Sequence, residues 1–320
     1  MIVGQWGIIL NLLSIAMITI MVTVGAISLL SIIFQERLSL ISPTTRKSIL
    51  WLFVSSPWWM AIVTTLLFYS TFATALGSEA LISVAHWHHP DIFEIASWHG
   101  VSIALFLIWV TVILVRKLNL LINSKQTQSS LIGFSKEQVQ GSSVIDSAVP
   151  NAFTCGFFFP KSYVTTGLKA HLNKEELAIV LAHEAAHVKN FDPLKKWVFM
   201  LFAAFFPARA SGKLKIAMSQ AMEQLADSSV VDLGYRNDTV ASTLVKVTRI
   251  SMRFKPESVS IVANSFHAEA LEERVKWLLN SHSSTVHFHY LILLLPCLLL
   301  LLSMFSVDRL HHLIETILNH

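Results

Sequence analysis

Four long apolar runs divide the chain. Residues 8–34, 49–76, 97–115 and 290–307 contain no Asp, Glu, Lys or Arg. A run of this length can cross the hydrocarbon core of a bilayer as a helix. The pattern therefore predicts four transmembrane helices, three of them before a long polar region and one after it. No basic residue precedes the first run and no cleavage site is evident, so we expect a retained anchor and not a removed signal peptide.

Composition supports a membrane protein with one modest polar part. Apolar residues make up 53% of the 320-residue chain and charged residues 14%, whereas a soluble domain carries about 25% charged residues. The mean hydropathy is +0.59. These values exclude a disordered chain, a fibrous repeat and an ordinary soluble enzyme. The two cysteines are far apart and one lies in an apolar run, so we expect no disulfide framework.

The basic residues predict how the chain crosses the membrane. Of the 24 lysines and arginines, 20 lie between residues 116 and 288 and three lie in the loop 35–48, while the loop 77–96 has none. Because basic loops stay in the cytosol, we expect residues 116–288 inside and both termini outside. The basic excess suits contact with anionic lipid headgroups. We find no basic-aromatic module and expect no direct binding to nucleic acid.

Polarity divides the chain into four parts. We expect an N-terminal membrane domain of three helices at 1–120, and a last helix with a short external tail at 289–320. Residues 121–148 are polar and rich in Ser and Gln, which predicts a linker with little fixed structure. Residues 149–288 then form the cytosolic domain, since the polar region is long enough for one hydrophobic core.

Local patterns predict a strand and a helix in this domain. Residues 162–166, SYVTT, are β-rich and predict a short strand. The preceding Pro160 indicates a position at the edge of a sheet. Asn173 followed by Glu176 predicts a capping box, which begins a helix that ends near Asn190.

The motif HEAAH lies within this helix, at residues 183–187. His183 and His187 are four residues apart, so both imidazoles lie on one helical face and can reach one metal ion. Glu184 lies beside them, where it can take a proton from water. Zinc suits such a site because it binds imidazole and carboxylate and can keep one position open. The alternative is a pair of ordinary histidines on a helix surface.

A third ligand is expected from a second acidic motif. Glu223 and Asp227 are also four residues apart, in AMEQLADSS. Glu223 can complete a set of two histidines and one glutamate. Asp227 can then accept the second N–H of a ligating imidazole and fix its tautomer. The alternative is an acidic face that points to solvent.

The segment between the two motifs has to keep them on one side of the membrane. We expect Asp192 to cap the next helix and not to bind metal. Residues 197–207, WVFMLFAAFFP, are apolar but too short to cross a bilayer alone. One full crossing would separate His183 from Glu223. We therefore expect a re-entrant, interfacial or core helix.

The motifs as an ordered set resemble a known family. The runs AFTCGFFFPKSYVTTGL, NKEELAIVLAHEAAHVKNFDPL, EQLAD and LEERVKWLL are similar to those of the integral-membrane zinc peptidases related to the β-lactam sensor-transducers of the BlaR/MecR type. The resemblance covers about 150–280, and the three helices before this region and the one after it also fit. HtpX-type and CaaX-type membrane peptidases share the HExxH and ExxxD motifs. They usually place a pair of spanning helices between the motifs, and this chain lacks such a pair, which favours the sensor-transducer relatives.

The resemblance implies a mainly α-helical, polytopic membrane protein with an α+β zincin-like metallopeptidase domain inserted before the last helix. It implies Zn²⁺ bound by His183, His187 and Glu223, with Glu184 as the catalytic base and Asp227 in support. The strand residues Ser162, Tyr163, Val164 and Thr165 would align an extended substrate by strand addition. The expected location is the inner membrane of a bacterial cell, with the active site in the cytosol.

The resemblance leaves the substrate open. Only 13 residues follow the last run, so we do not expect the external penicillin-binding domain or the β-lactam response. The substrate would be a cytosolic protein such as a transcriptional repressor, or the chain itself. The alternatives are an HtpX-like quality-control protease and a non-proteolytic signalling scaffold with a structural zinc ion. The outer histidines of HWHHPD, at 86–91, could bind metal or report pH, although interfacial histidines without such a role are commoner.

Overall fold

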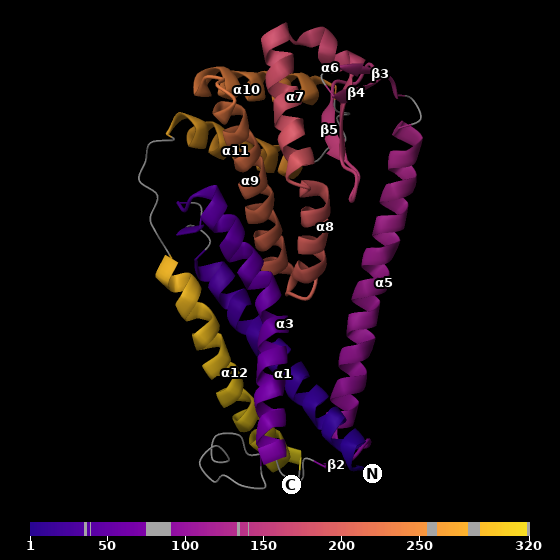
Figure 1. Cartoon of the computed structure of the whole chain (residues 1–320), viewed down its shortest axis with the longest axis vertical. Coiled ribbons are helices and arrows are strands. Elements are labelled where there is room, and N and C mark those ends of the chain that lie inside the picture. The colour runs from indigo at the N-terminus through magenta and orange to yellow at the C-terminus, as the bar shows by residue number, and fades with distance from the viewer. Residues whose placement is uncertain are drawn as a thin grey trace.

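Four long helices form the lower part of the molecule in the computed structural model (Figure 1). They are α1 (Gln5–Ile33), α3 (Pro43–Thr74), α5 (Trp98–Ile132) and α12 (His289–Leu318). Each has a segment long and apolar enough to cross a membrane, which confirms the predicted four spans. The structure describes residues 1–34, 37–38, 40–74, 91–132, 135–139, 141–254, 261–280 and 289–318. The histidines at 86, 88 and 89 lie outside these ranges.

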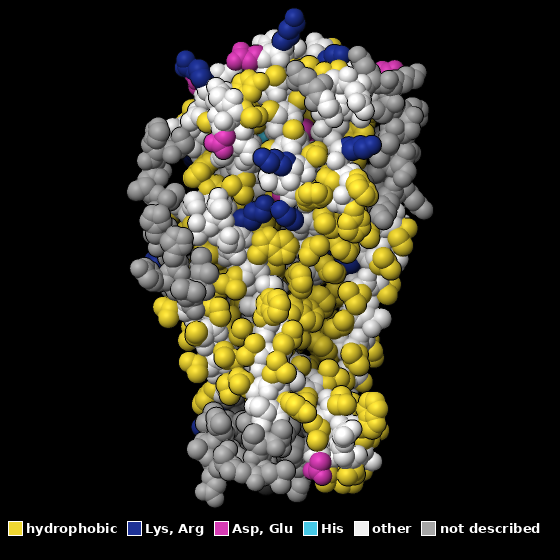
Figure 2. Space-filling view, viewed as in Figure 1, with side chains coloured by type: hydrophobic (Ala, Val, Ile, Leu, Met, Phe, Trp, Pro, Cys, Tyr) yellow, Lys and Arg dark blue, Asp and Glu magenta, His cyan; other side chains and the backbone are white. Residues whose placement is uncertain are grey.

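Both termini lie at the end of the molecule away from the polar domain (Figure 1). The short strands β1 (Ile2–Val3) and β2 (Ile92–Phe93) pair there in antiparallel fashion. On the face drawn in Figure 2, Lys and Arg side chains gather over the polar domain and hydrophobic side chains cover the region below it. This division matches a domain that stands on one side of a membrane.

The polar domain contains a four-stranded sheet. Its strands are β3 (Ser135–Val139), β4 (Ser142–Ile145), β5 (Ala152–Cys155) and β6 (Lys161–Thr165), in the order β3-β4-β6-β5. β6 pairs in parallel with β4 and antiparallel with β5. Val144, Val164 and Leu168 are buried under the helix that carries the HEAAH motif.

Two predictions about this region are wrong. Residues 121–148 are not a linker without fixed structure, because α5 continues to Ile132 and β3 and β4 belong to the sheet. The strand at 161–165 is not an edge strand, because it has a partner on both sides. β5 is the strand at that edge of the sheet. Pro160 stands in the turn before β6, where its missing N–H costs no sheet hydrogen bond.

The remaining helices of the domain surround the sheet and one another (Figure 1). α6 (Thr166–His171) follows β6, and α7 (Lys174–Lys189) packs against both β5 and β6. α8 and α9 follow as a helical hairpin, α8 at Asp192–Ala203 and α9 at Ala208–Asp232. α10 (Asn237–Arg253) and α11 (Ile261–Leu279) then close over α7 and α9.

The turn of the α8–α9 hairpin packs among the spanning helices. Phe199, Phe206 and Leu214 belong to one buried cluster with residues of α1 and α3. The ring of Phe205 lies 5.0 Å from Trp58 of α3 and 5.5 Å from Trp109 of α5, centroid to centroid. Both tryptophans are inside candidate spans. The segment 197–207 is therefore part of a helical hairpin that enters between the candidate spans and returns Glu223 to the side of His183. We call it the re-entrant hairpin.

Candidate metal centre

The helix α7 is begun by the capping box that its sequence predicts. Asn173 Oδ1 accepts a hydrogen bond from the N–H of Glu176 at 2.8 Å, and Glu176 Oε2 accepts one from the N–H of Asn173 at 2.8 Å. Lys246 of α10 also donates to Glu176, at 2.6 Å from Oε2. These contacts secure the first turn. His183, Glu184 and His187 lie in the last two turns.

Three side chains from two helices converge on one point. His183 Nε2 lies 3.2 Å from His187 Nε2 and 3.4 Å from Glu223 Oε2. Glu223 Oε1 is 3.7 Å from His187 Nε2. A tetrahedral zinc ion with bonds of about 2.0–2.1 Å separates its ligand atoms by roughly 3.3–3.4 Å. The three residues thus fit a zinc ion in both ligand chemistry and spacing.

Each histidine is oriented by a different carboxylate. His183 Nδ1 lies 2.9 Å from Asp227 Oδ1, the contact expected for Asp227. His187 Nδ1 lies 2.8 Å from Asp192 Oδ2. The prediction that Asp192 caps α8 is wrong, since Phe191 occupies the cap position, with a φ of 53°. This left-handed residue turns the chain sharply after α7 and directs Asp192 back toward His187.

Arg274 of α11 holds both acidic residues of α9. Its Nε and Nη2 donate to Asp227 at 2.8 and 2.7 Å, and Nη1 lies 3.2 Å from Glu223 Oε2. Burial alone would raise the pKa values of these carboxyls, but contacts with Arg274 and His183 lower both. Burial opposes protonation of His183, yet Asp227 and Glu223 outweigh it and raise its pKa to about 10. A metal ion must therefore displace a proton here.

Glu184 lies beside the three ligands and contacts the edge strand. The hydroxyl of Thr154, in β5, donates a 2.7 Å hydrogen bond to Glu184 Oε2. The same hydroxyl is 3.1 Å from the backbone oxygen of Glu184. Glu184 is 8% exposed, so this contact fixes a buried carboxylate next to the metal ligands.

Two cations from the first turns of α3 also reach this centre. Lys47 Nζ lies 3.4 Å from Asp192 Oδ1. Arg46 is 2% exposed and donates through Nη2 to Gln224, the neighbour of Glu223. A transmembrane helix thus contributes to the polar surroundings of both metal-binding helices.

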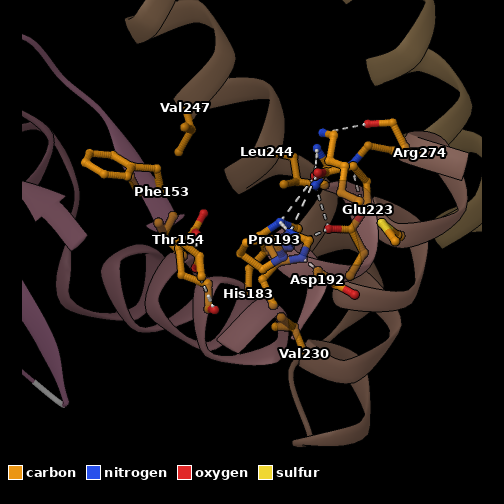
Figure 3. Close-up of a pocket in the computed structure, with 18 of the residues that line it drawn as sticks. Phe153, Thr154, His183, Asp192, Pro193, Glu223, Val230, Leu244, Val247 and Arg274 are labelled. Carbon is orange, nitrogen blue, oxygen red and sulfur yellow. Dashed lines mark hydrogen bonds and ion pairs between the residues drawn. The ribbon is translucent and has the colours of Figure 1, made fainter. Parts of the chain in front are cut away.

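The centre opens into a cavity of about 580 Å³. Figure 3 shows Phe153 and Thr154 of β5 on one side of it, and Glu223 and Arg274 on the other. Leu244 and Val247 of α10 add an apolar wall. The cavity is therefore a cleft between an edge strand and a helix, with the metal-binding residues at its floor.

The expected substrate-binding residues do not line this cleft. The four positions of β6 are at most 6% exposed and β6 is covered on both edges. They are Ser162, Tyr163, Val164 and Thr165. The cleft is lined instead by Asn151, Ala152, Phe153 and Thr154. The prediction that a substrate adds to the strand at residues 162–165 is therefore wrong, because that strand has no free edge.

The fold and the site together define a class. An HExxH helix, a second helix with ExxxD, and an edge strand beside the glutamate are the parts of a membrane metallopeptidase of the HExxH type. A model of peptidase family M48 matches residues 121–287, more than half of the chain. The chain belongs to peptidase family M48.

Curated relatives named protease HtpX homolog match parts of the chain. The protein from Pyrococcus furiosus is 26% identical, over 35% of this chain and 51% of its own length. The protein from Gemmatimonas aurantiaca is 27% identical, over 42% and 62%. The protein from Limosilactobacillus fermentum is 49% identical, over 15% and 17%. The chain thus spans about half the length of the first relatives that it matches. No solved structure gives a significant match.

These matches confirm the relationship to membrane metallopeptidases but not the narrower assignment. The named relatives are HtpX homologs, the group that the sequence analysis kept as an alternative. This chain lacks the pair of spanning helices that such peptidases usually place between the two motifs. The α8–α9 hairpin occupies that position and packs against three of the spans, so the missing pair does not separate the chain from HtpX homologs.

Proposed function

We propose that the protein is an HtpX-like, membrane-embedded zinc endopeptidase that hydrolyses peptide bonds of protein substrates at the cytosolic face of the cytoplasmic membrane. The observation that carries this proposal is the triangle of His183, His187 and Glu223 beside Glu184. Among the described residues, three side chains form this cluster. Three protein ligands leave one position open, as catalytic zinc sites do, whereas structural sites are closed by four. This favours an enzyme over a scaffold.

The residues divide the chemistry between them. A zinc ion held there would supply a Lewis acid and lower the pKa of water to about 7. Glu184 is placed to take the proton from the attacking water and to pass it to the leaving amine. The hydroxyl of Thr154 orients the Glu184 carboxylate through its 2.7 Å bond. Asp227 and Asp192 hold the two imidazoles so that their Nε2 atoms face the metal position.

The edge strand supports a peptide as the substrate. β5 has a strand partner on one side, and its other edge lies along the cleft. An extended peptide can add to such an edge through backbone hydrogen bonds. This would place a scissile carbonyl over the metal position, close to Glu184. Leu244 and Val247 would then face side chains of the peptide.

The breadth of substrates separates two roles. A quality-control protease cleaves many misfolded membrane proteins, and a regulatory protease cleaves one repressor or itself. The HtpX homologs and the re-entrant hairpin support the first role. We therefore propose quality control, and treat the repressor or self-cleavage role as the alternative outcome of the test.

The test compares new protein N-termini in cells that express wild type or Glu184→Gln at equal levels. We expect new termini in many membrane proteins with wild type alone. One dominant cytosolic target would support the regulatory role instead. Identical termini in the two strains, under conditions that induce membrane-protein misfolding, would contradict a protease. Equal zinc content of both proteins is the control that the variant preserves the site.

A further inference from the structure

The turn between β5 and β6 presents phenylalanines to the surroundings. Phe158 is 73% exposed and Phe159 is 86% exposed. The turn is a defined structure, because Gly156 has a φ of 102° and a Cβ there would lie 2.7 Å from the backbone oxygen of Phe159. Two such rings side by side in water are unfavourable, since apolar surface is driven out of water. Their exposure indicates a partner surface.

The turn is attached to the re-entrant hairpin. The ring of Phe157 lies 6.0 Å from that of Trp197 in α8, centroid to centroid. Two and six residues further along α8, Phe199 and Ala203 are buried in the cluster that includes α1 and α3. The position of the turn relative to the spanning helices is therefore set by direct packing.

The height of the turn matches the end of the spans. In Figure 1 the lower end of the β5–β6 hairpin lies near the upper end of α8, in agreement with the ring contact between Phe157 and Trp197. The candidate span of α3 begins at Pro43, and Lys47, about one turn into it, lies 3.4 Å from Asp192, the first residue of α8. Phe191, which directly precedes α8, is 45% exposed.

The charges next to the turn favour a lipid surface over a protein partner. Lys161 follows the turn directly, and Lys195 and Lys196 precede Trp197 on α8; all three are exposed. Arg116 and Lys117 lie near the same end of the α5 span. Aromatic rings flanked by basic residues are typical of the membrane–water interface, where rings enter the acyl boundary and cations meet phosphate groups.

We propose that the turn 156–160 inserts Phe158 and Phe159 into the leaflet next to the peptidase domain. Phe157 of this turn and its ring partner Trp197 of α8 both line the cleft. One end of the cleft therefore opens at the lipid surface, and a chain segment that leaves the bilayer meets the site there. The insertion goes beyond the proposed function, because it does not depend on proteolysis.

The experiment measures the surroundings of a probe at the turn. An environment-sensitive fluorophore is attached to Phe159→Cys in a Cys297→Ala background, in full-length protein in nanodiscs that hold one copy each. Cys155 stays unlabelled because it is 5% exposed and burial raises the pKa of its thiol. The matched control is Leu233→Cys. Leu233 is apolar and 69% exposed, and it follows the C-terminal end of α9, away from the turn of the α8–α9 hairpin.

We expect blue-shifted emission at position 159, with quenching by lipids that carry a spin label near the headgroup. The probe at position 233 should emit as in water and escape quenching. Equal, water-like emission at both positions would overturn the proposal. Blue-shifted emission at 159 that appears only with two copies per disc would also overturn it, in favour of contact between copies. Neither result would bear on the zinc site, so the two proposals fail separately.

Discussion

The metal-binding histidines depend on carboxylates from two different helices. Asp227 belongs to the same helix as the ligand Glu223, whereas Asp192 begins α8. Such second carboxylates fix the tautomer and the ring orientation of a ligating histidine. The two histidines therefore have separate supports, and each support can be removed alone.

The first prediction concerns Asp192→Asn. The amide keeps the size of the side chain but removes the charge that holds His187 Nδ1, so zinc affinity should fall about 10–100-fold. Competition with a chelator measures this in the full-length protein. Asp238→Asn is the control, since Asp238 is exposed and paired with Arg236. Unchanged affinity in Asp192→Asn would show that this contact does not support the ligand.

The predictable part of the site lies within single helices. HEAAH and ExxxD could be assigned because residues four apart share a helical face. The role of Asp192 could not be predicted, because it depends on the left-handed turn at Phe191. Arg274 and Thr154 come from elements far away in the sequence, and no local pattern in either segment points to a carboxylate partner.

Among the elements, α7 has in its first turn a glutamate that accepts hydrogen bonds from a lysine and from the backbone. The hydrogen bond from Lys246, and that from the backbone N–H of Asn173, lower the pKa of Glu176 below its ordinary 4.5. A carboxyl with a lowered pKa stabilises the fold above its ordinary pKa, and this stabilisation is lost as the pH falls through the lowered value. The stability of α7 should therefore depend on Glu176 at neutral pH and not in acid.

The second prediction follows from this dependence. Glu176→Gln can keep the capping box but loses the ion pair with Lys246, so the free energy of unfolding should fall by about 0.2–1 kcal/mol at pH 7. The difference from wild type should shrink below pH 4.5, where the carboxyl of wild type is progressively protonated. Thermal unfolding at the two pH values measures it. Glu175→Gln, in the same turn, serves as the control. An equal difference at both pH values would contradict the assignment.

The order of strands within the sheet was harder to predict than the presence of a strand at 161–165. The strand at 161–165 was recognised from its β-rich residues, but its neighbour β4 arises from SSVI in a Ser-rich stretch. The polar composition of this stretch does not predict a buried strand. Serine is tolerated there because the hydroxyls of Ser142 and Ser162 form a hydrogen bond of 2.7 Å with each other inside the sheet. Because β6 is paired on both sides, the free sheet edge to which a substrate could add belongs to β5.

At the scale of the whole molecule, the membrane domain and the metal centre are joined. The re-entrant hairpin packs among the spans, and α3 contributes Lys47 and Arg46 to the surroundings of the centre. The hydrophobic pattern predicted the four spans and showed that 197–207 was too short to cross. It could not predict the contacts of Arg46 and Lys47, which join residues more than 140 positions apart.

The third prediction tests this junction. Lys47→Met keeps the length of the side chain but removes the cation next to Asp192, so the carboxylate should hold His187 less firmly. Zinc affinity should fall, by less than in Asp192→Asn, and Lys47→Arg should restore part of it. Chelator competition is the measurement. If Lys47→Met and wild type bind zinc equally, the contact from α3 does not position the ligand.

The fourth prediction concerns the orientation in the membrane. Both termini lie at the end opposite the peptidase domain (Figure 1), and the basic residues favour a cytosolic domain. A phosphatase that is active only outside the cytosol should therefore be active when fused after His320. The same enzyme inserted after Gly234, between α9 and α10, should be inactive. The reverse pattern would contradict the proposed orientation.

The proposal of a zinc endopeptidase with Glu184 as its base is tested by comparing purified wild type with Glu184→Gln in lipid nanodiscs. Zinc content and cleavage of an unfolded protein substrate are measured on the same samples. We expect one zinc ion per chain in both proteins, with cleavage by wild type and a loss of several orders of magnitude in the variant. Equal cleavage by both proteins, or wild type that binds no zinc, would contradict it.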